Sequence, residues 1–332
     1  MVDAAAMTKP EELLERAWDL LEDGDLDGAR SLGERLLGDE ASKLDALLVL
    51  AACDREEGET ARALDNLRQA TEADPEWAMP VLWTAEILAT EPGRVEEALS
   101  LAARAMDLAD EEDLYLDALA LKAGIEVGLG KTKAAIATLA EAPPVGEAEV
   151  PAPIARELGH LFLAVNDAAS SRERFEALVA EDPSDADSWH GLGYAADALG
   201  DSKARDAAWL KTLALDIEAD DEMGGDAVTD EELVALASST VTTLPRRVMR
   251  FLEGVPMKAL AYPSDDEVRG GIDPRAVLRL VPSDGAGSVP AEVRLYRKAL
   301  ERECDDAEAM SDELADALTI ESERVLGADG DA

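Results

Sequence analysis

The pattern that decides the fold is Trp189-x2-Leu192-Gly193-x2-Ala196, followed by the turn Gly200-Asp201. A second copy precedes it and reads Leu158-Gly159-x2-Phe162, followed by Asn166-Asp167, Phe175 and Pro183. The inner glycine of each copy lets two helices approach closely. The Gly or Asn of each turn accepts the left-handed backbone that ends a helix. Each copy therefore predicts a helix, a tight turn and a second helix.

The same turn recurs along the first two-thirds of the chain. It begins at Gly24, Gly58, Gly93, Gly130, Asn166 and Gly200, at successive spacings of 34, 35, 37, 36 and 34 residues. Five residues after four of these turns stands an alanine, namely Ala29, Ala63, Ala98 and Ala135. A small side chain there lets the second helix nest against the next unit. The regular period predicts a helical repeat array, with a set of unrelated helical hairpins as the alternative.

The pattern resembles the tetratricopeptide repeat, and the resemblance covers residues 10–216 in about six helical hairpins. It implies an α-solenoid whose first helices line a concave groove for another protein or peptide. The repeat positions that face the groove in this family correspond to Arg55, Arg156, His160, Asp187, His190 and Tyr194. Their mixed cationic, aromatic and acidic character suits a peptide segment or a chain terminus. The alternative is that they belong to ordinary solvated helix faces.

Composition agrees with a mostly α protein, because hydrophobic residues make up 47% of the chain and aromatic residues only 4%. Alanine and leucine thus supply most of the core, which favours packed helices over a sandwich or barrel. The formal net charge is -43. Binding to nucleic acid or to an anionic membrane needs clustered Lys and Arg, so neither is expected as a partner. A basic protein partner, or life at high salt, fits this charge better.

Cysteine usage and the N-terminal sequence favour a cytoplasmic protein, and no cofactor is expected. Cys53 and Cys304 are the only cysteines and fall in different predicted domains, so no disulfide framework is expected. No stretch is long and apolar enough to cross a membrane, and Met1-Val2-Asp3 lacks the basic and apolar segments of a signal peptide.

One stretch matches a calcium-binding pattern. Asp23-x-Asp25-x-Asp27-Gly28-x5-Glu34 has the spacing of an EF-hand loop, with alternating carboxylates, a glycine bend and a glutamate at position twelve. The same residues form the first turn of the repeat array, in register with the other five. Loop position eight, apolar in an EF-hand, is Arg30. The stretch is therefore interpreted as a repeat turn, and no metal site is predicted.

The chain changes character after the repeats. Residues 1–9 are predicted as a disordered N-terminus, 217–228 as an acidic linker, 229–327 as a small α+β domain and 328–332 as a tail. In the α+β domain Thr229 is expected to cap a helix that runs toward Leu244-Pro245. A short helix over 246–253, strands within 255–263, 277–281 and 292–296, and a last helix over about 311–326 are expected to follow.

The order of these elements resembles the minimal zincin-like metallopeptidases of bacteria. The matching landmarks are Glu232-Leu233-Val234, Leu244-Pro245, Val255-Pro256, the segment 293–301 and the last helix. The resemblance implies a His-Glu-x-x-His motif in the last helix, where this chain has Ile320-Glu321-Ser322-Glu323-Arg324. Glu321 keeps the position of the general base and Gly327 that of the following glycine. Both zinc-binding histidines are replaced, by Ile320 and Arg324.

The loss of these histidines decides the expected chemistry. Two histidines at positions i and i+4 of a helix hold the zinc that lowers the pKa of the attacking water to about 7. No histidine follows His190, so none can substitute. The domain is therefore predicted to be an inactivated peptidase-like domain, with Glu321 as a relic and no catalytic residues. Two alternatives remain: a metal-dependent peptidase or hydrolase with an unconventional site here, or an accidental zincin resemblance.

Overall fold

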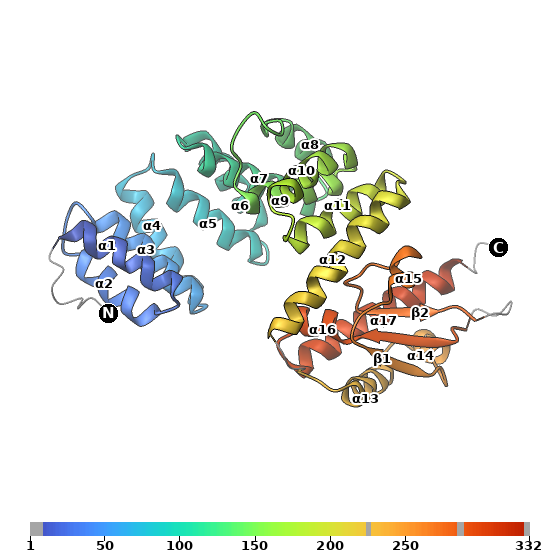
Figure 1. Ribbon diagram of the computed structural model, residues 1–332. Coiled ribbons are helices and arrows are strands. Elements are labelled where there is room, and N and C mark those ends of the chain that lie inside the picture. Colours follow the sequence, from blue (N-terminus) through green and yellow to red (C-terminus); the bar gives the residue numbers. More distant parts are fainter. Residues whose placement is uncertain (1–8, 224–226, 284–288, 329–332) are drawn as a thin grey trace. The chain divides into compact units, whose positions relative to one another are not determined.

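The computed structural model of the chain describes residues 9–223, 227–283 and 289–328 (Figure 1). Residues 1–8 of the predicted N-terminal segment and 329–332 of the predicted tail lie outside the described residues. The repeat part consists of α1 Pro10–Glu22, α2 Leu26–Leu36, α3 Lys43–Glu56, α4 Thr60–Ala73, α5 Ala78–Thr90, α6 Val95–Leu108, α7 Glu112–Gly128, α8 Thr132–Leu139, α9 Ala152–Ala164, α10 Ala168–Glu181, α11 Ala186–Ala198 and α12 Ser202–Met223.

The six predicted turns join these helices in pairs and confirm the repeat register. All six turn residues have left-handed backbone, with φ between 63° at Asn166 and 80° at Gly93. At five of these turns the amide of the following residue donates to the carbonyl five residues earlier, at 2.7–2.9 Å. This bond satisfies a carbonyl that the end of the helix would otherwise leave unpaired. The turn residues thus end the first helix of each pair.

Small residues allow the helices of the repeats to pack closely. The four alanines that follow the turns, Ala29, Ala63, Ala98 and Ala135, are completely buried. Gly193 of α11 faces the indole of Trp209 in α12, and a Cβ at this position would lie 2.0 Å from Trp209 Cδ1. The predicted need for a small residue at these positions is confirmed.

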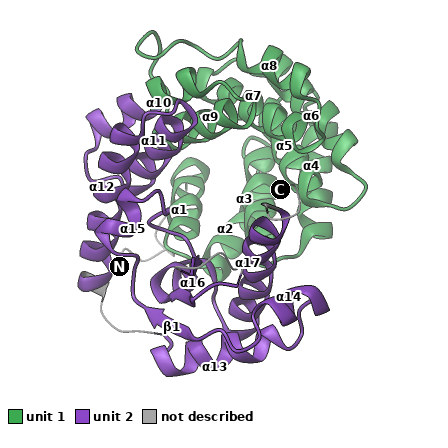
Figure 2. Cartoon of the chain, turned by 90° about the vertical axis from the view of Figure 1, so that its right-hand side faces the viewer, with its two compact units in different colours: residues 1–174 green, residues 175–332 purple. Residues whose placement is uncertain are grey.

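The chain divides into two compact units, residues 1–174 and 175–332, here called unit 1 and unit 2 (Figure 2). Unit 1 contains α1 to α9 and the beginning of α10. Unit 2 contains the end of α10, α11, α12 and the C-terminal α+β domain. The division falls within α10 and does not coincide with the acidic linker predicted at 217–228.

That predicted linker differs from the structure, because α12 continues to Met223. The acidic residues at the end of the helix have partners in the C-terminal domain. Asp216 pairs with Arg275 and Arg302, and Asp220 accepts a hydrogen bond from Tyr262. These contacts offset the like charges that made the stretch resemble a solvated linker. Residues 224–226 lie outside the described part of the chain.

The C-terminal domain has the predicted α+β composition. Its elements are α13 Asp230–Val241, α14 Arg246–Phe251, β1 Met257–Leu260, α15 Asp265–Arg269, β2 Leu278–Val281, β3 Glu292–Tyr296, α16 Arg297–Glu303 and α17 Ala307–Ala328. The sheet order is β1-β3-β2, with β1 parallel and β2 antiparallel to β3, and Val293 of β3 lies opposite both Met257 and Leu280. Leu233, Val293 and Leu314 are fully buried in the core between the helices and the sheet.

Two capping boxes start helices of this domain. Thr229 caps α13 as predicted, since its hydroxyl accepts from the amide of Glu232 and the Glu232 side chain accepts from the amide of Thr229. Ser264 and Glu267 form the same arrangement at α15, a helix that the sequence analysis did not predict. The signal was present, because Ser264-Asp265-Asp266-Glu267 is a capping-box sequence.

Among the described residues no helix is long and apolar enough to cross a membrane.

Candidate functional site

The six residues predicted to face a binding groove lie on first helices of their pairs. Arg55 is in α3 and Arg156 and His160 are in α9, all within unit 1. Asp187, His190 and Tyr194 are in α11, within unit 2. Three of the six residues therefore belong to unit 1 and three to unit 2.

In unit 1 the guanidinium of Arg55 connects α3 with α5. Its Nη1 donates to Glu86 Oε2 at 3.2 Å, and its Cζ lies 5.2 Å from the centre of the Trp83 ring. Trp83 in turn contacts Trp18 edge to face, with ring centres 6.2 Å apart. A cation held over an indole face is stabilised by the ring quadrupole. This part of unit 1 thus combines aromatic and charged groups on neighbouring first helices.

Three carboxylates continue this surface along α5, α7 and α9. Burial raises the pKa of Glu86, and the like charges of Asp117 and Glu157 raise it further, against the opposing charge of Arg55. Burial also raises the pKa of Asp117 and of Glu157, and the charge of Asp117 adds to the rise at Glu157. The carboxylates therefore lie close enough to repel one another, and a cation placed among them would be stabilised.

We call the surface formed by Arg55, Trp83, Glu86, Asp117 and Glu157 the unit 1 acidic face. The predicted residues Arg156 and His160 flank Glu157 on α9, where His160 is exposed and Arg156 half-buried. The three carboxylates were not predicted from the sequence. Acidic residues are frequent in this chain, and only the packed helices show which of them share one partly desolvated surface.

In unit 2 the predicted groove residues contact the chain's own C-terminal domain. His190 Nε2 lies 2.8 Å from Asp273 Oδ1, and the Tyr194 hydroxyl donates to the other oxygen of Asp273. Asp187 accepts a hydrogen bond of 2.7 Å from Arg275 Nη1. Asp273 and Arg275 belong to the loop between α15 and β2. We call the surface formed by Asp187, His190, Tyr194 and Asp216 the α11–α12 face.

Arg275 is held on this face by two carboxylates. Its Nε and Nη2 donate to the two oxygens of Asp216, both at 2.9 Å, while Nη1 reaches Asp187. Arg302 Nη1 also donates to Asp216, at 3.0 Å. Such bidentate pairs are among the stronger hydrogen bonds in proteins. Asp216, whose side chain is only 7% exposed, thus has two guanidinium partners.

Asp273 is ionised on this face because its partners outweigh its burial. Burial opposes the charged form, but hydrogen bonds from His190 and Tyr194 and from the amide of Arg275 lower the pKa of Asp273 below its usual range. Burial and the charge of Asp273 in turn raise the pKa of Tyr194. His190 and Tyr194 pack edge to face at 5.0 Å, and Tyr194 packs on Trp209 at 5.6 Å, which fixes both donors.

Glu267 forms a second buried charge cluster in unit 2. Its side chain is 6% exposed and accepts hydrogen bonds from Arg294 and Tyr296 at 2.8 Å, from Arg279 at 3.3 Å and from the Ser264 cap. Burial acts to raise its pKa, but these hydrogen bonds dominate and lower the pKa to about 2. These hydrogen bonds join α15 to strands β2 and β3 of the sheet.

The last helix, α17, places the residues of the degenerate peptidase motif near its C-terminal end. Ile320 is 65% exposed, and the Glu321 carboxylate pairs with Arg324, Nη2 to Oε2 at 2.6 Å. Arg324 occupies the position of the second zinc-binding histidine in the resemblance, so it neutralises the glutamate that would act as base. In the parts of the chain that the structure describes, no three His, Cys, Asp or Glu side chains are grouped to hold a metal ion.

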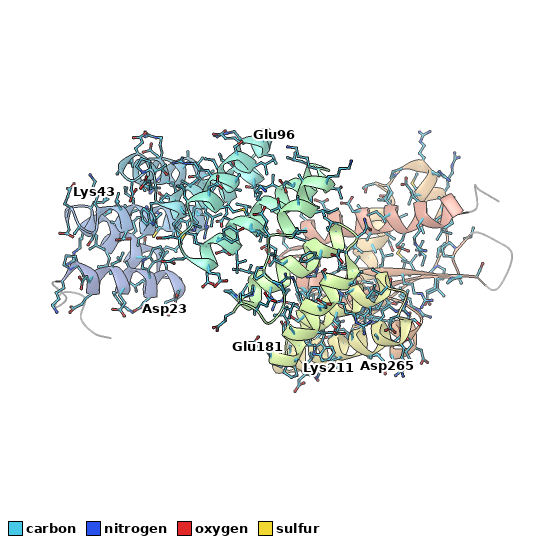
Figure 3. All side chains as sticks on the ribbon, turned by 90° about the horizontal axis from the view of Figure 1, so that it is seen from above. Asp23, Lys43, Glu96, Glu181, Lys211 and Asp265 are labelled. Carbon is cyan, nitrogen blue, oxygen red and sulfur yellow. The ribbon has the colours of Figure 1, made fainter. Side chains whose placement is uncertain are left out.

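The calcium-like stretch takes the conformation of a repeat turn. Asp23 follows the last residue of α1 (Figure 3), and Asp25 caps α2 by accepting from the amide of Gly28 at 3.0 Å. Residues 26–36 are helical, so the twelve-residue loop of an EF-hand is not formed. Arg30 pairs with Asp54 and Glu57 at 2.9 Å each.

The two cysteines are buried thiols in different units. Cys53 lies in α3 and Cys304 follows α16, and neither forms a disulfide. Burial raises the pKa of both thiols. A raised pKa lowers the thiolate fraction, so neither has the environment of a reactive nucleophile.

Comparison with known proteins supports the repeat fold. The crystal structure of PilW, described as a widely conserved type IV pilus biogenesis factor, is 19% identical with a TM-score of 0.51, and the match covers 63% of this chain and 94% of PilW. PilF of Pseudomonas aeruginosa is 16% identical with a TM-score of 0.51, over 62% of this chain and 91% of PilF. A tetratricopeptide-repeat protein of Thermus thermophilus is 21% identical, with a TM-score of 0.45, over 57% of this chain and 99% of that chain.

The likenesses to PilW and PilF show the fold alone, a tetratricopeptide-like array of helical repeats. No protein-family model and no curated protein matches the sequence. The predicted zincin-like character of the C-terminal domain stays a prediction.

Proposed function

We propose that this protein is a non-catalytic scaffold that binds a basic segment of another protein through the unit 1 acidic face. The observation that carries the proposal is the group of three carboxylates, Glu86, Asp117 and Glu157, on consecutive first helices. Burial raises their pKa values, and repulsion from neighbouring carboxylates raises those of Glu86 and Glu157 further. Lys or Arg side chains of a partner would relieve that repulsion.

Trp83 and Arg55 give this face a second kind of contact. Trp83 offers an aromatic surface beside the carboxylates, and aromatic residues often provide the anchors of protein interfaces. Arg55 lies over that ring and pairs with Glu86. A lysine or arginine of the partner could replace Arg55 at both positions. The proposed ligand is therefore an extended or helical segment with alternating basic and apolar residues.

The test uses a labelled twelve-residue peptide of alternating lysine and leucine, titrated into the full-length chain. Glu86→Gln, Asp117→Asn and Glu157→Gln are combined in one variant. The matched control, Glu72→Gln with Glu97→Gln and Asp107→Asn, removes three exposed carboxylates from the second helices α4 and α6. We expect at least about tenfold weaker binding for the first variant, since each lost charged contact contributes about 1 kcal/mol or more. The control should stay within about twofold, because its three carboxylates are not part of the unit 1 acidic face.

Equal losses in the two variants would contradict the proposal. Binding would then depend on the total charge of the chain, and the unit 1 acidic face would have no special role. A peptide of alternating glutamate and leucine should not bind measurably, because it would be repelled by the same face.

We further propose that the C-terminal domain is an inactivated peptidase-like domain. What supports this is the substitution of both motif histidines and the Glu321–Arg324 pair on α17. The purified protein should carry no stoichiometric zinc by metal analysis and should cleave no unstructured peptide substrate. About one zinc per chain, lost on Glu321→Gln, would contradict it and favour the hydrolase alternative.

A further inference from the structure

We propose that the α11–α12 face is a second binding site, specific for an Asp-x-Arg segment, and that the chain's own Asp273-Pro274-Arg275 closes it as an internal ligand. An external segment of the same chemistry would replace this loop, which we call the latch. The proposal concerns unit 2 alone and does not depend on what the unit 1 acidic face binds.

The first support is the division of the face into two complementary halves. His190 and Tyr194 both direct polar hydrogens at the carboxylate of Asp273, and the rings of these donors pack against each other and Trp209. One turn of helix earlier on α11, Asp187 accepts from the guanidinium of Arg275. The face therefore binds a carboxylate and a guanidinium from residues that are two positions apart in the sequence.

The second support is that the latch forms a turn with hydrogen bonds of its own. Gly270 and Gly271 precede it, and Gly271 has left-handed backbone with φ 89°. Asp273 accepts from the amide of Arg275 at 2.8 Å and, through its own carbonyl, from the amide of Ala276 at 3.1 Å. The turn is thus stabilised by hydrogen bonds within the loop itself. A segment of a separate chain with the same residues can form the same turn.

The third support is that the face can open without leaving a buried charge unpaired. Asp216 is the most buried carboxylate of the site, and it keeps Arg302 as a partner when Arg275 leaves. Asp187 is 55% exposed and can be solvated at once. An opened face therefore avoids the large penalty of an uncompensated buried charge.

The fourth support is that α12 and α15 have contacts outside the latch. Trp209 and Leu213 of α12 bury their side chains with Val268 of α15, and Tyr262 packs against this cluster and bonds Asp220. Releasing the latch leaves this apolar cluster in place. The C-terminal domain would therefore stay attached to α12 while the α11–α12 face becomes accessible.

The experiment uses a labelled peptide with the sequence of residues 269–279, titrated into full-length protein and followed by fluorescence anisotropy. In the wild-type chain the latch competes with the peptide. In the Asp273→Asn, Arg275→Gln variant, called the opened variant, the latch loses both of the charges that the face binds. We expect at least about tenfold tighter peptide binding to this variant, because charged hydrogen bonds of the latch contribute about 1.5–3 kcal/mol each.

The matched control is Asp265→Asn with Arg269→Gln. It removes one carboxylate and one guanidinium from an exposed pair on the neighbouring helix α15, where Asp265 is labelled in Figure 3. This control should bind the peptide no better than wild type. A second peptide, with the Asp and Arg of the motif exchanged, should bind the opened variant at least about tenfold more weakly.

Two additional measurements decide between the proposal and a purely structural loop. Adding His190→Ala and Tyr194→Phe to the opened variant should abolish peptide binding if the peptide takes the place of the latch. Hydrogen exchange of amides 270–276 should speed up in the opened variant but not in the control. Peptide binding that is equal in wild type and opened variant, binding that survives His190→Ala with Tyr194→Phe, or unchanged exchange at 270–276 would each overturn the proposal.

Discussion

The unit 1 acidic face and the α11–α12 face both include first helices of one repeat array, yet the negative charges of the two faces are neutralised to different degrees. In unit 1, Glu86, Asp117 and Glu157 repel one another and have raised pKa values. In unit 2, Asp273 has a lowered pKa because His190 and Tyr194 donate to it. The first face has one guanidinium, that of Arg55, for three carboxylates, whereas the second receives Arg275 from its own chain. Equivalent repeat positions can therefore serve an external partner in one unit and an internal one in the other.

The largest expected difference between the units comes from Asp216. Its replacement by alanine removes the shared partner of Arg275 and Arg302 at a nearly buried position. We expect unit 2 to lose about 3 kcal/mol of unfolding free energy, as is typical when one member of a buried ion pair is removed. Urea unfolding monitored by tryptophan fluorescence measures the change.

Arg55→Ala in unit 1 supplies the reference for that measurement, because Arg55 and Glu86 form a half-exposed pair. A loss from Asp216→Ala as small as that from Arg55→Ala would show that the network on the α11–α12 face does not stabilise unit 2.

A second expected difference concerns glycines. Gly193→Ala places a Cβ against the Trp209 ring in unit 2, so α11 and α12 must separate or the ring must move. We expect a cost of about 2–3 kcal/mol, as for other overpacked helix contacts. Gly58→Ala in unit 1 meets no neighbouring atom and pays only for the left-handed backbone, about 1 kcal/mol. Thermal unfolding of the two variants gives this comparison, and a larger loss at Gly58 would contradict it.

Acidification should act on the two units in opposite directions. The folded pKa of Glu267 is about 2, below its ordinary value of 4.5. Its stabilisation of unit 2 is therefore complete above about pH 4.5 and is lost as the pH falls toward 2, by about 3 kcal/mol at most. The raised pKa values in the unit 1 acidic face have the opposite sign, so protonation of those carboxylates as the pH falls relieves repulsion and stabilises unit 1.

The pH effect is checked by hydrogen exchange in the two units between pH 5 and pH 3, corrected for the intrinsic exchange rate. Glu267→Gln should remove most of the acid sensitivity of unit 2. If unit 1 lost protection before unit 2 did, the assignment of the two charge clusters would be wrong.

The smallest expected effect is that of Arg55→Ala on stability. The Arg55–Glu86 pair is partly solvated, so we expect a change of about 0–1 kcal/mol in the unfolding free energy. Its effect on the binding of a basic peptide should be no more than a few-fold in either direction, because removing Arg55 also leaves Glu86 more accessible to a cation. A change of several kcal/mol would show that Arg55 is a structural residue of unit 1.

The sequence was sufficient to predict the repeats because a left-handed turn can be recognised locally. All six turn residues from Gly24 to Gly200 have the expected backbone, and the four alanines that follow are buried. The three strands of the C-terminal domain were also predicted, since each is a short apolar stretch between turn residues. These features depend on residues that are neighbours in the sequence.

The features that were missed depend on residues far apart in the sequence. Asp216, directly before the predicted linker, lies in a helix that continues to Met223, and Arg275 and Arg302, 59 and 86 residues away, neutralise it. The repeat register identified Asp187, His190 and Tyr194 as facing residues, but it contained no information that Asp273 and Arg275 would cover them. Long-range ion pairs leave no periodic pattern, so charge alone could not distinguish a linker from the end of a helix.

The most direct test of the central claim is hydrogen exchange on the full-length chain with and without the lysine–leucine peptide. The claim is that the two faces differ, with the unit 1 acidic face open to a basic partner and the α11–α12 face closed by the latch. The peptide should protect amides in α5, α7 and α9, which carry Glu86, Asp117 and Glu157, and leave amides 270–276 unchanged. Protection confined to α11 and α12 together with faster exchange at 270–276, or no change in α5, α7 and α9, would contradict the account.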